Sequence, residues 1–291
     1  PPARPQRPRL YFTSESLPAL RQRFESDPKL RGARGRLIQA AEAALEMELP
    51  DEQWARGGRG QHSNYYRVAN VAKEVVLNCA FAFALTGQER FAQRAIEGIR
   101  HFAGYEQWTS PSFFKRDRPW QSALETARLA RAHLLGIDCL GEALSGEDLQ
   151  IAMEALMRLG VEPLMQDWID PAHRVHALDS MGHNWWMVCV GAAGLGALTL
   201  LEHDKRAEQW LKLVVEGLPQ FFSYPGNVLQ NKIRSFDPDG GFYESLAYAG
   251  FTLRYYFYLH AALKHMFPNG AFGHRFDQLA PQVNGMAEFM L

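Results

Sequence analysis

Two segments of the sequence hold residues whose types and spacing suit chemistry. In the first, residues 181–190, the side chains of His183, Asn184 and Trp185 stand where a loop meets a strongly apolar stretch. If that stretch is a helix, its free N–H groups and its dipole favour a bound carboxylate at this point. The same residues also fit a structural role, because Asn184 or Ser180 can cap a helix. Anion binding and capping are both consistent with the sequence.

The second segment, residues 236–250, places tyrosines after a sharp turn. Asp-Pro-Asp-Gly-Gly at positions 237–241 is a strong turn sequence, and Tyr243, Glu244 and Tyr248 follow it. Glu244 and Tyr248 are four residues apart, so on a helix they would share one face. A phenol can transfer protons in catalysis. The alternative is that each tyrosine is a core residue.

The elements that must position these residues are helices. In residues 89–105 apolar side chains recur three and four positions apart, which is the period of an amphipathic helix. Ser145 and Asp148 indicate a helix start before residues 149–168. No segment shows the convincing alternation of a strand. Further helices are predicted over residues 17–25, 30–47, 66–85, 120–140, 183–202, 207–222 and 243–266.

The predicted helices come in pairs joined by short polar turns, at residues 86–90 and 202–206. Short connections make such neighbours antiparallel. The first helix of each pair is apolar nearly all round and should be buried on both sides, whereas the second has one wet face. Repeated hairpins of this kind predict an all-α fold, either an incomplete (α/α)n toroid of paired antiparallel helices or a solenoid.

We divide the chain into an extended N-terminal segment, residues 1–12, and one toroid domain, residues 13–291. The first nine residues are rich in proline and arginine, and we expect them to be disordered or a processed end. Four long connections, residues 49–64, 104–119, 169–182 and 224–241, carry aromatic and charged side chains. Aromatic faces beside Arg and Asn suit a sugar-binding cleft. The alternative is that these rings cap the ends of the helices.

Composition narrows the class of partner. The formal net charge is −1, so the chain lacks the global positive field that holds nucleic acid. An anionic ligand must therefore be held locally. Arginine- and lysine-rich clusters in residues 56–67 and 115–118 can do so, or they are solvated loop charges. The longest apolar stretch, residues 188–201, is too short to span a membrane.

The three cysteines, Cys79, Cys139 and Cys189, lie far apart in apolar helical patterns. Their odd number and their spacing argue against a disulfide framework or a zinc site. We predict buried structural thiols, and we expect neither a metal nor a cofactor in this domain.

Together, the two segments resemble the heparinase II/III-like polysaccharide lyases, a group that includes heparin, alginate and broad-specificity glycosaminoglycan lyases. The similarity runs from about residue 8 to about residue 267, and Trp-Gln-Ser-Ala-Leu-Glu-Thr-Ala-Arg-Leu-Ala at 120–130 is also typical of the family. The resemblance implies an α/α toroid followed by an antiparallel β-sandwich, with the cleft between them. The sequence up to Leu291 is helical or loop-like, so we expect the β-sandwich to be absent from this chain. Either the chain is a fragment, or the remaining half is supplied separately, or the activity is impaired.

The resemblance also implies roles for particular residues. Tyr248 matches the family tyrosine that acts as base, acid or both, with Tyr243 as the alternative. Asn184 with His183 matches the group that neutralises the uronate carboxylate. The resemblance further implies an anionic polysaccharide substrate and therefore a periplasmic or secreted protein. The residues expected to bind substrate are Glu244, Trp185, Trp120, Arg118, Gln121, Tyr66 and Arg67.

The chemistry explains why such residues are needed. β-Elimination removes the C5 proton of a uronic acid and expels the C4 oxygen. A hydrogen bond to the carboxylate from Asn184 or His183 would stabilise the enolate-like transition state by on the order of 3 kcal/mol. A free phenol has a pKa of about 10 and is a poor base at neutral pH. We therefore expect a cation, protonated His183 or Arg234, to stabilise the phenolate.

Two other functions fit parts of the sequence. An α/α-barrel glycoside hydrolase needs two carboxylates across a cleft, and Asp237, Asp239, Glu244 and Glu125 are candidates, although three of them lie in one turn segment. A non-catalytic glycan-binding helical domain is the other alternative. The products discriminate, because a lyase makes an unsaturated uronate that absorbs ultraviolet light and a hydrolase does not.

Overall fold

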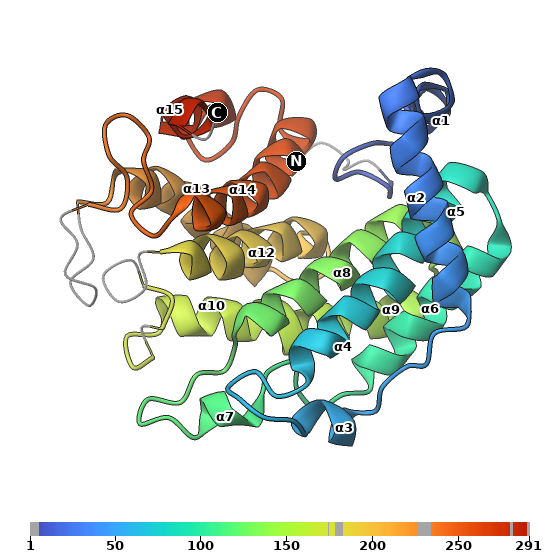
Figure 1. Ribbon diagram of the computed structural model, residues 1–291, viewed down its shortest axis with the longest axis horizontal. Coiled ribbons are helices and arrows are strands. Elements are labelled where there is room, and N and C mark those ends of the chain that lie inside the picture. Colours follow the sequence, from blue (N-terminus) through green and yellow to red (C-terminus); the bar gives the residue numbers. More distant parts are fainter. Residues whose placement is uncertain (1–5, 174, 178–182, 226–233, 280–281, 290–291) are drawn as a thin grey trace.

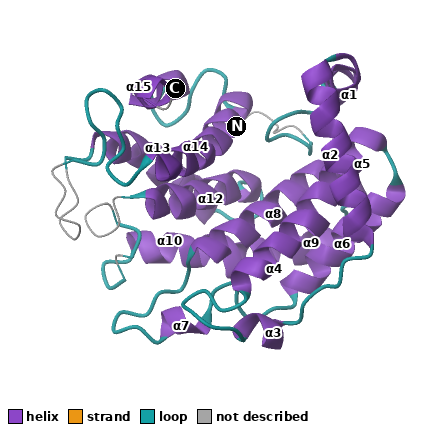
Figure 2. Ribbon diagram, viewed as in Figure 1, coloured by secondary structure: helices purple, strands orange, loops and turns teal. Residues whose placement is uncertain are grey.

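The computed structural model is an all-α toroid (Figure 1), and it describes residues 6–173, 175–177, 183–225, 234–279 and 282–289. Across these ranges there are two isolated β-bridges and no sheet, and Figure 2 draws no strand. The helices in chain order are α1 (Leu17–Ser26), α2 (Pro28–Leu45), α3 (Glu52–Arg56), α4 (Tyr65–Ala72), η1 (Lys73–Asn78), α5 (Cys79–Thr86), α6 (Glu89–Ala103), α7 (Pro111–Phe114), α8 (Leu124–Leu140), η2 (Gly141–Ala143), α9 (Gly146–Ala155), η3 (Leu156–Val161), α10 (Glu162–Ile169), α12 (Asn184–Leu200), α13 (Arg206–Ser223), α14 (Leu246–Met266), η4 (Phe276–Gln278) and α15 (Gln282–Phe289).

The helical pairs form an inner and an outer layer, as the sequence predicts. The inner row runs from α4–η1–α5 to α8, then α12, then α14, each helix packing against the next (Figure 1). In α12 every residue except Trp185 is buried, because the helix is apolar all round. The outer helices α6 and α13 pack on α5 and α12 and turn their polar faces outward. Because an outer helical run returns the chain between one inner helix and the next, the inner helices run in the same direction.

One continuous helix, Tyr65–Thr86, is long and apolar enough to cross a membrane, and more than half of that stretch is buried inside the toroid. Burial of this kind is typical of a core helix. Its middle is the π-helical turn η1, which packs against glycines of two neighbouring helices. A Cβ on Gly136 of α8 would lie 2.5 Å from Cγ1 of Val76. Glycine therefore permits the close approach of these two inner helices.

The N-terminal segment is ordered where the structure describes it. The backbone N–H groups of Arg9 and Leu10 donate to the carboxylate of Asp138 at 2.9 and 3.1 Å. The Arg9 guanidinium pairs with Glu202 at 2.8 Å, and both Arg9 and Leu10 are buried. The disorder expected up to Arg9 is thus wrong at Arg9 itself, because a buried carboxylate needs these donors. Burial raises the pKa of Asp138 to about 6, and the two N–H groups oppose that shift.

Some details of the prediction are confirmed and others are corrected. All three cysteines are free and buried, as predicted, and burial raises the pKa of Cys79 to about 12. The short helices α3 and α7 lie in segments that the sequence predicts as loops. Helix α8 begins at Leu124 rather than at residue 120, because the Thr126 hydroxyl receives the Ala123 N–H at 3.0 Å and fixes the helix start there.

Candidate active site

The candidate site is a cavity of about 500 Å³ around which all four inner helices begin. The positive end of a helix dipole lies at each of these helix starts. Four such ends around one cavity favour an anionic ligand. The lining residues are Gln61 and His62 before α4, Tyr66 of α4, Leu124 of α8, Asn184 and Trp185 of α12, and Ala247, Tyr248 and Phe251 of α14.

The start of α12 is fixed by His183, which is its N-cap. The Nδ1 atom of His183 accepts the Trp185 N–H at 3.4 Å, so the ring proton belongs on Nε2. Capping by Asn184 is therefore wrong, since Asn184 is the first helical residue, and Ser180 lies outside the described residues. Burial lowers the pKa of His183 to about 4. At neutral pH the ring is uncharged, so it does not provide the phenolate-stabilising cation expected from the sequence.

Asn184 is held by Glu244 from the other sequence segment. The Nδ2 atom of Asn184 donates to both carboxylate oxygens of Glu244, at 2.9 and 3.0 Å, and its backbone N–H donates at 2.9 Å. Asn184 is 2% exposed, and its Oδ1 atom is buried without a hydrogen bond. Burial raises the pKa of Glu244, and the bonds from Asn184 oppose that rise. Glu244 thus fixes the Asn184 amide rather than lining the cavity.

Tyr248 stands in the first turn of α14. The helix begins at Leu246 rather than at residue 243, because the Ser245 hydroxyl caps it by accepting the Tyr248 N–H at 3.3 Å. The prediction that Glu244 and Tyr248 share a helix face is therefore wrong. Glu244 precedes the cap and turns to α12, whereas Tyr248 lines the cavity and is 49% exposed.

Tyr243, the alternative tyrosine, does not line the cavity. Its ring packs edge-on against Phe242 at 5.2 Å between ring centroids, and its backbone N–H donates to the Ser235 carbonyl at 3.2 Å. These contacts make it part of the turn that precedes α14. Of the two tyrosines, Tyr248 is the one positioned to reach a ligand.

An aromatic wall of Trp185, Trp120 and Phe113 adjoins the cavity, which Trp185 lines. Trp185 of α12 meets Trp120 edge-on at 5.8 Å, and Trp120 stacks on Phe113 at 5.3 Å. The Arg116 guanidinium lies over the Trp120 ring at 3.9 Å from its centroid. The expected residues Trp185 and Trp120 therefore lie together, and such faces suit the apolar side of a sugar ring.

The sequence reasoning missed His62 as a site residue. Its Nδ1 atom lies 2.6 Å from Oε2 of Glu125, which is fully buried and also accepts the Ser110 N–H at 3.1 Å. The signal in the sequence is Glu125 itself, an acidic residue on a helix face that is otherwise apolar, since a buried carboxylate requires a partner. The sequence indicates Glu125 only as a possible hydrolase carboxylate, and His62 stands in the predicted loop at 49–64.

Gln121 belongs to a neighbouring cluster beside the aromatic wall. Its backbone N–H donates to both carboxylate oxygens of Asp167, at 3.0 and 3.1 Å, and its side chain lies 3.5 Å from Nδ1 of His173. The Ser122 hydroxyl joins Asp167 at 2.8 Å to His176 at 2.9 Å. Burial raises the pKa of Asp167 and lowers that of His176 to about 3. This cluster anchors the loop before α8 rather than lining the cavity.

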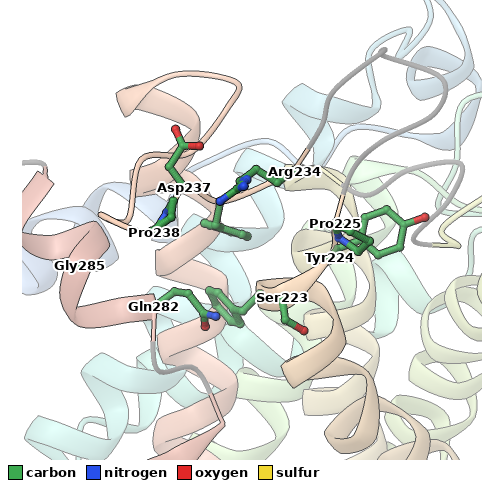
Figure 3. A pocket seen from close by; sticks show the side chains of 10 residues that line it. Ser223, Tyr224, Pro225, Arg234, Asp237, Pro238, Gln282 and Gly285 are labelled. Carbon is green, nitrogen blue, oxygen red and sulfur yellow. The ribbon is translucent and has the colours of Figure 1, made fainter.

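Three other expected residues lie away from the cavity. Arg67 and Arg118 are exposed and are not among the lining residues. Arg234, the other expected cation, lines a separate pocket with Ser223, Asp237 and Gln282 (Figure 3). Neither proposed phenolate-stabilising cation is therefore in place. Within the described ranges, no three His, Cys, Asp or Glu side chains gather as metal ligands.

Comparison with known proteins places the fold. The structure matches an alginate lyase from Bacteroides ovatus with a TM-score of 0.66 and 11% sequence identity, over 99% of this chain and 83% of that chain. The chain thus shares an all-α toroid fold with that lyase, which confirms the predicted fold class. No family model matches the sequence. No curated protein matches it either. The likeness shows the fold, and the function rests on the site.

Proposed function

We propose that the protein is a polysaccharide lyase that cleaves a uronic-acid-containing glycan, a glycosaminoglycan or alginate, by β-elimination. The observation that carries the proposal is the convergence of four inner-helix starts on the cavity that holds Tyr248. Helix starts favour a carboxylate, and a phenol beside that carboxylate can transfer the protons of an elimination. The toroid shared with an alginate lyase supports the same class.

In this proposal the substrate carboxylate lies at the start of α12. The neutral His183 ring carries its proton on Nε2, and this N–H donates a hydrogen bond to the carboxylate as the enolate-like charge develops. Asn184 lies beside it, and because its Nδ2 donates to both oxygens of Glu244 at 2.9 and 3.0 Å, it holds the start of α12 in position. Donors that are fixed in advance stabilise the transition state without reorganising, at on the order of 3 kcal/mol each.

The sugar ring would lie against the aromatic wall. Trp185 and Tyr66 both line the cavity, and the apolar face of a pyranose stacks on such rings. Tyr248, partly exposed at the start of α14, then faces the bond between C4 and its oxygen. We assign it the proton transfer of the reaction, as base, acid or both.

Two further parts of the proposal concern the setting of the enzyme. A β-sandwich domain, as the family resemblance implies, would cover the cavity from outside. The matched alginate lyase has additional length, since the alignment covers 83% of it. A polymeric uronate is an extracellular substrate, so we place the activity in the periplasm or the medium. The proposed elimination requires no cofactor.

An ultraviolet assay against heparin, chondroitin, hyaluronan and alginate tests the proposal. A lyase converts at least one polymer into an unsaturated uronate, and absorbance rises with time. Release of new reducing ends without absorbance would instead identify a glycoside hydrolase with an inverting or retaining carboxylate pair. Binding of a polymer without any product would identify a glycan-binding domain.

A further inference from the structure

The proposed elimination needs a base for the C5 proton, and the cavity offers one besides Tyr248. A phenol is a poor base at neutral pH unless a cation stabilises its phenolate. Among the described residues that line the cavity there is no arginine or lysine, and the ring of His183, the N-cap of α12, is neutral at pH 7. Tyr248 therefore suits proton donation better than proton removal. This inference rests on the proposed function.

His62 has the geometry of an oriented base. Its Nδ1 atom lies 2.6 Å from Oε2 of Glu125. Because a carboxylate oxygen accepts hydrogen bonds, the ring N–H is on Nδ1 and the lone pair is on Nε2. The Gln61 Nε2 atom lies 3.1 Å from that ring nitrogen, while its Oε1 accepts from Arg116 at 3.1 Å. The Gln61 amide is thus oriented as a donor to Nε2. Gln61 is exposed, so a substrate that presents its C5–H to Nε2 of His62 would displace this side chain.

The protein holds this imidazole firmly. Glu125 is fully buried, and its second oxygen accepts the Ser110 N–H at 3.1 Å. The next residue in the chain, Ser63, has a φ of 47°, and its hydroxyl lies 2.9 Å from that of Ser110. A left-handed conformation is costly for a residue other than glycine. The strain at Ser63 is consistent with a loop whose geometry is set by the placement of His62.

His62 and Tyr248 stand at the two ends of the row of inner helices. His62 precedes α4, Tyr248 begins α14, and α8 and α12 lie between those two helices. Both side chains line the one cavity, and the His62 ring lies 5.8 Å from the ring of Trp185. A sugar that stacks at Trp185 therefore has an imidazole on one side and a phenol on the other.

We infer that His62 is the catalytic base and Tyr248 the catalytic acid, with Glu125 as the positioning residue of His62. The C5–H bond breaks and its proton passes to Nε2 of His62. The electron pair forms the C4–C5 double bond as the C4–O bond breaks. The Tyr248 hydroxyl protonates the departing oxygen. Proton exchange with water then returns the imidazolium and the phenolate to their starting states.

The test compares His62→Ala with His101→Ala on the glycan that the wild-type protein cleaves. His101 is the matched control, because its ring has a fixed hydrogen bond to the Pro50 carbonyl at 2.7 Å and does not line the cavity. General-base catalysis contributes about 100-fold or more. We expect kcat of His62→Ala to fall by about that factor with KM little changed, while His101→Ala retains the wild-type rate.

Added imidazole separates catalysis from folding. Imidazole should restore part of the lost rate in His62→Ala and leave His101→Ala unchanged, because a free base can occupy the vacated space. Glu125→Gln, which keeps the shape but removes the charge, should lower kcat more than it changes KM, and Glu125→Asp should recover part of that loss.

Each outcome decides the inference. A His62→Ala rate within about threefold of wild type overturns the base role and leaves the lyase function standing. A low rate that imidazole does not raise, in a variant that melts like wild type, also overturns it. A wild-type protein without any ultraviolet-absorbing product overturns the proposed function itself, and the role of His62 with it.

Discussion

The carboxylate of Glu244 accepts both the side-chain amide and the backbone N–H of Asn184, a residue 60 positions earlier in the chain. The contact fastens the start of α12 to the turn that leads into α14. Because Tyr248 stands in the first turn of α14, this one carboxylate sets the distance between the proposed anion-binding donors and the proposed acid.

Replacing Glu244 with Gln should therefore damage stability and activity together. The change removes the charge that receives three hydrogen bonds, and hydrogen bonds to charged groups contribute about 1.5–3 kcal/mol each. We expect unfolding at clearly lower urea concentration and a large fall in kcat. Glu208→Gln, on the exposed face of α13, is the matched control. Wild-type stability in Glu244→Gln would show that the contact is not structurally important.

Asn184→Ala should lower both kcat and the melting temperature. The side chain is buried and bonded to Glu244, so its loss leaves a carboxylate with fewer partners, at about 1–3 kcal/mol. Trp185→Ala removes the adjacent ring without touching Glu244. It should raise KM and affect melting less than Asn184→Ala does. A melting temperature unchanged in Asn184→Ala would contradict the bonding described.

The buried histidine of α8 predicts loss of stability in acid. Burial lowers the pKa of His133 to about 4, below the value of about 6.5 expected for the unfolded chain. The unfolded state therefore binds the proton first as the pH falls from 6.5 towards 4, and folding loses free energy over that window. This residue alone should make the protein about 2 kcal/mol less stable at pH 5 than at pH 7.

Urea unfolding at both pH values measures the effect by difference. Asp138 has a raised pKa of about 6, which favours the folded state in acid and opposes the effect of His133. The effect of His133 is therefore measured by comparing variants, not from the total pH dependence of the wild-type protein. His133→Gln should shrink the gap between pH 7 and pH 5, and His203→Gln, at an exposed turn, should leave it unchanged. Equal gaps in the two variants would refute a neutral buried His133.

Gly136 should not tolerate a side chain. A Cβ there would lie 2.5 Å from Val76, and overpacking a core costs about 1–3 kcal/mol. Gly136→Ala should therefore destabilise the wild-type protein, and it should cost less in a Val76→Ala background, where the space exists. Gly35→Ala, with nothing within 4 Å on exposed helix α2, should be neutral or stabilising. Equal costs of Gly136→Ala in both backgrounds would argue against the clash.

The layers of the toroid could be predicted from the sequence because the pattern of apolar residues in each helix shows how many of its faces are buried. The apolar stretch at 188–201 predicts a helix buried on all sides, and α12 is one. The start of α14 was harder to place, since residues from Tyr243 onward are compatible with a helix. The local signal is Ser245, a residue type that favours N-caps. Because the helix starts after Ser245, Glu244 lies before the helix and Tyr248 lies in its first turn.

Site residues could be predicted where they lie together in one sequence segment. They could not be predicted where two distant segments contribute to one contact. His183, Asn184 and Tyr248 stand in recognisable motifs. His62 does not, because its proposed role depends on a contact with Glu125, which is 63 residues away. The hydrophobic periodicity of a single sequence carries no information on such distant pairs. The arginines are hard to place from the sequence for a related reason: charge alone does not show that Arg67 and Arg118 are exposed and do not line the cavity.

The most direct test of the account is the paired assay of Tyr248→Phe and Tyr243→Phe on the glycan that the wild-type protein cleaves. Each variant loses one hydroxyl, but only Tyr248 lines the cavity. Calorimetric titration with the same glycan checks that binding survives. The account predicts that Tyr248→Phe binds the polymer without forming an unsaturated product and that Tyr243→Phe remains active. Near-wild-type turnover by Tyr248→Phe would contradict it.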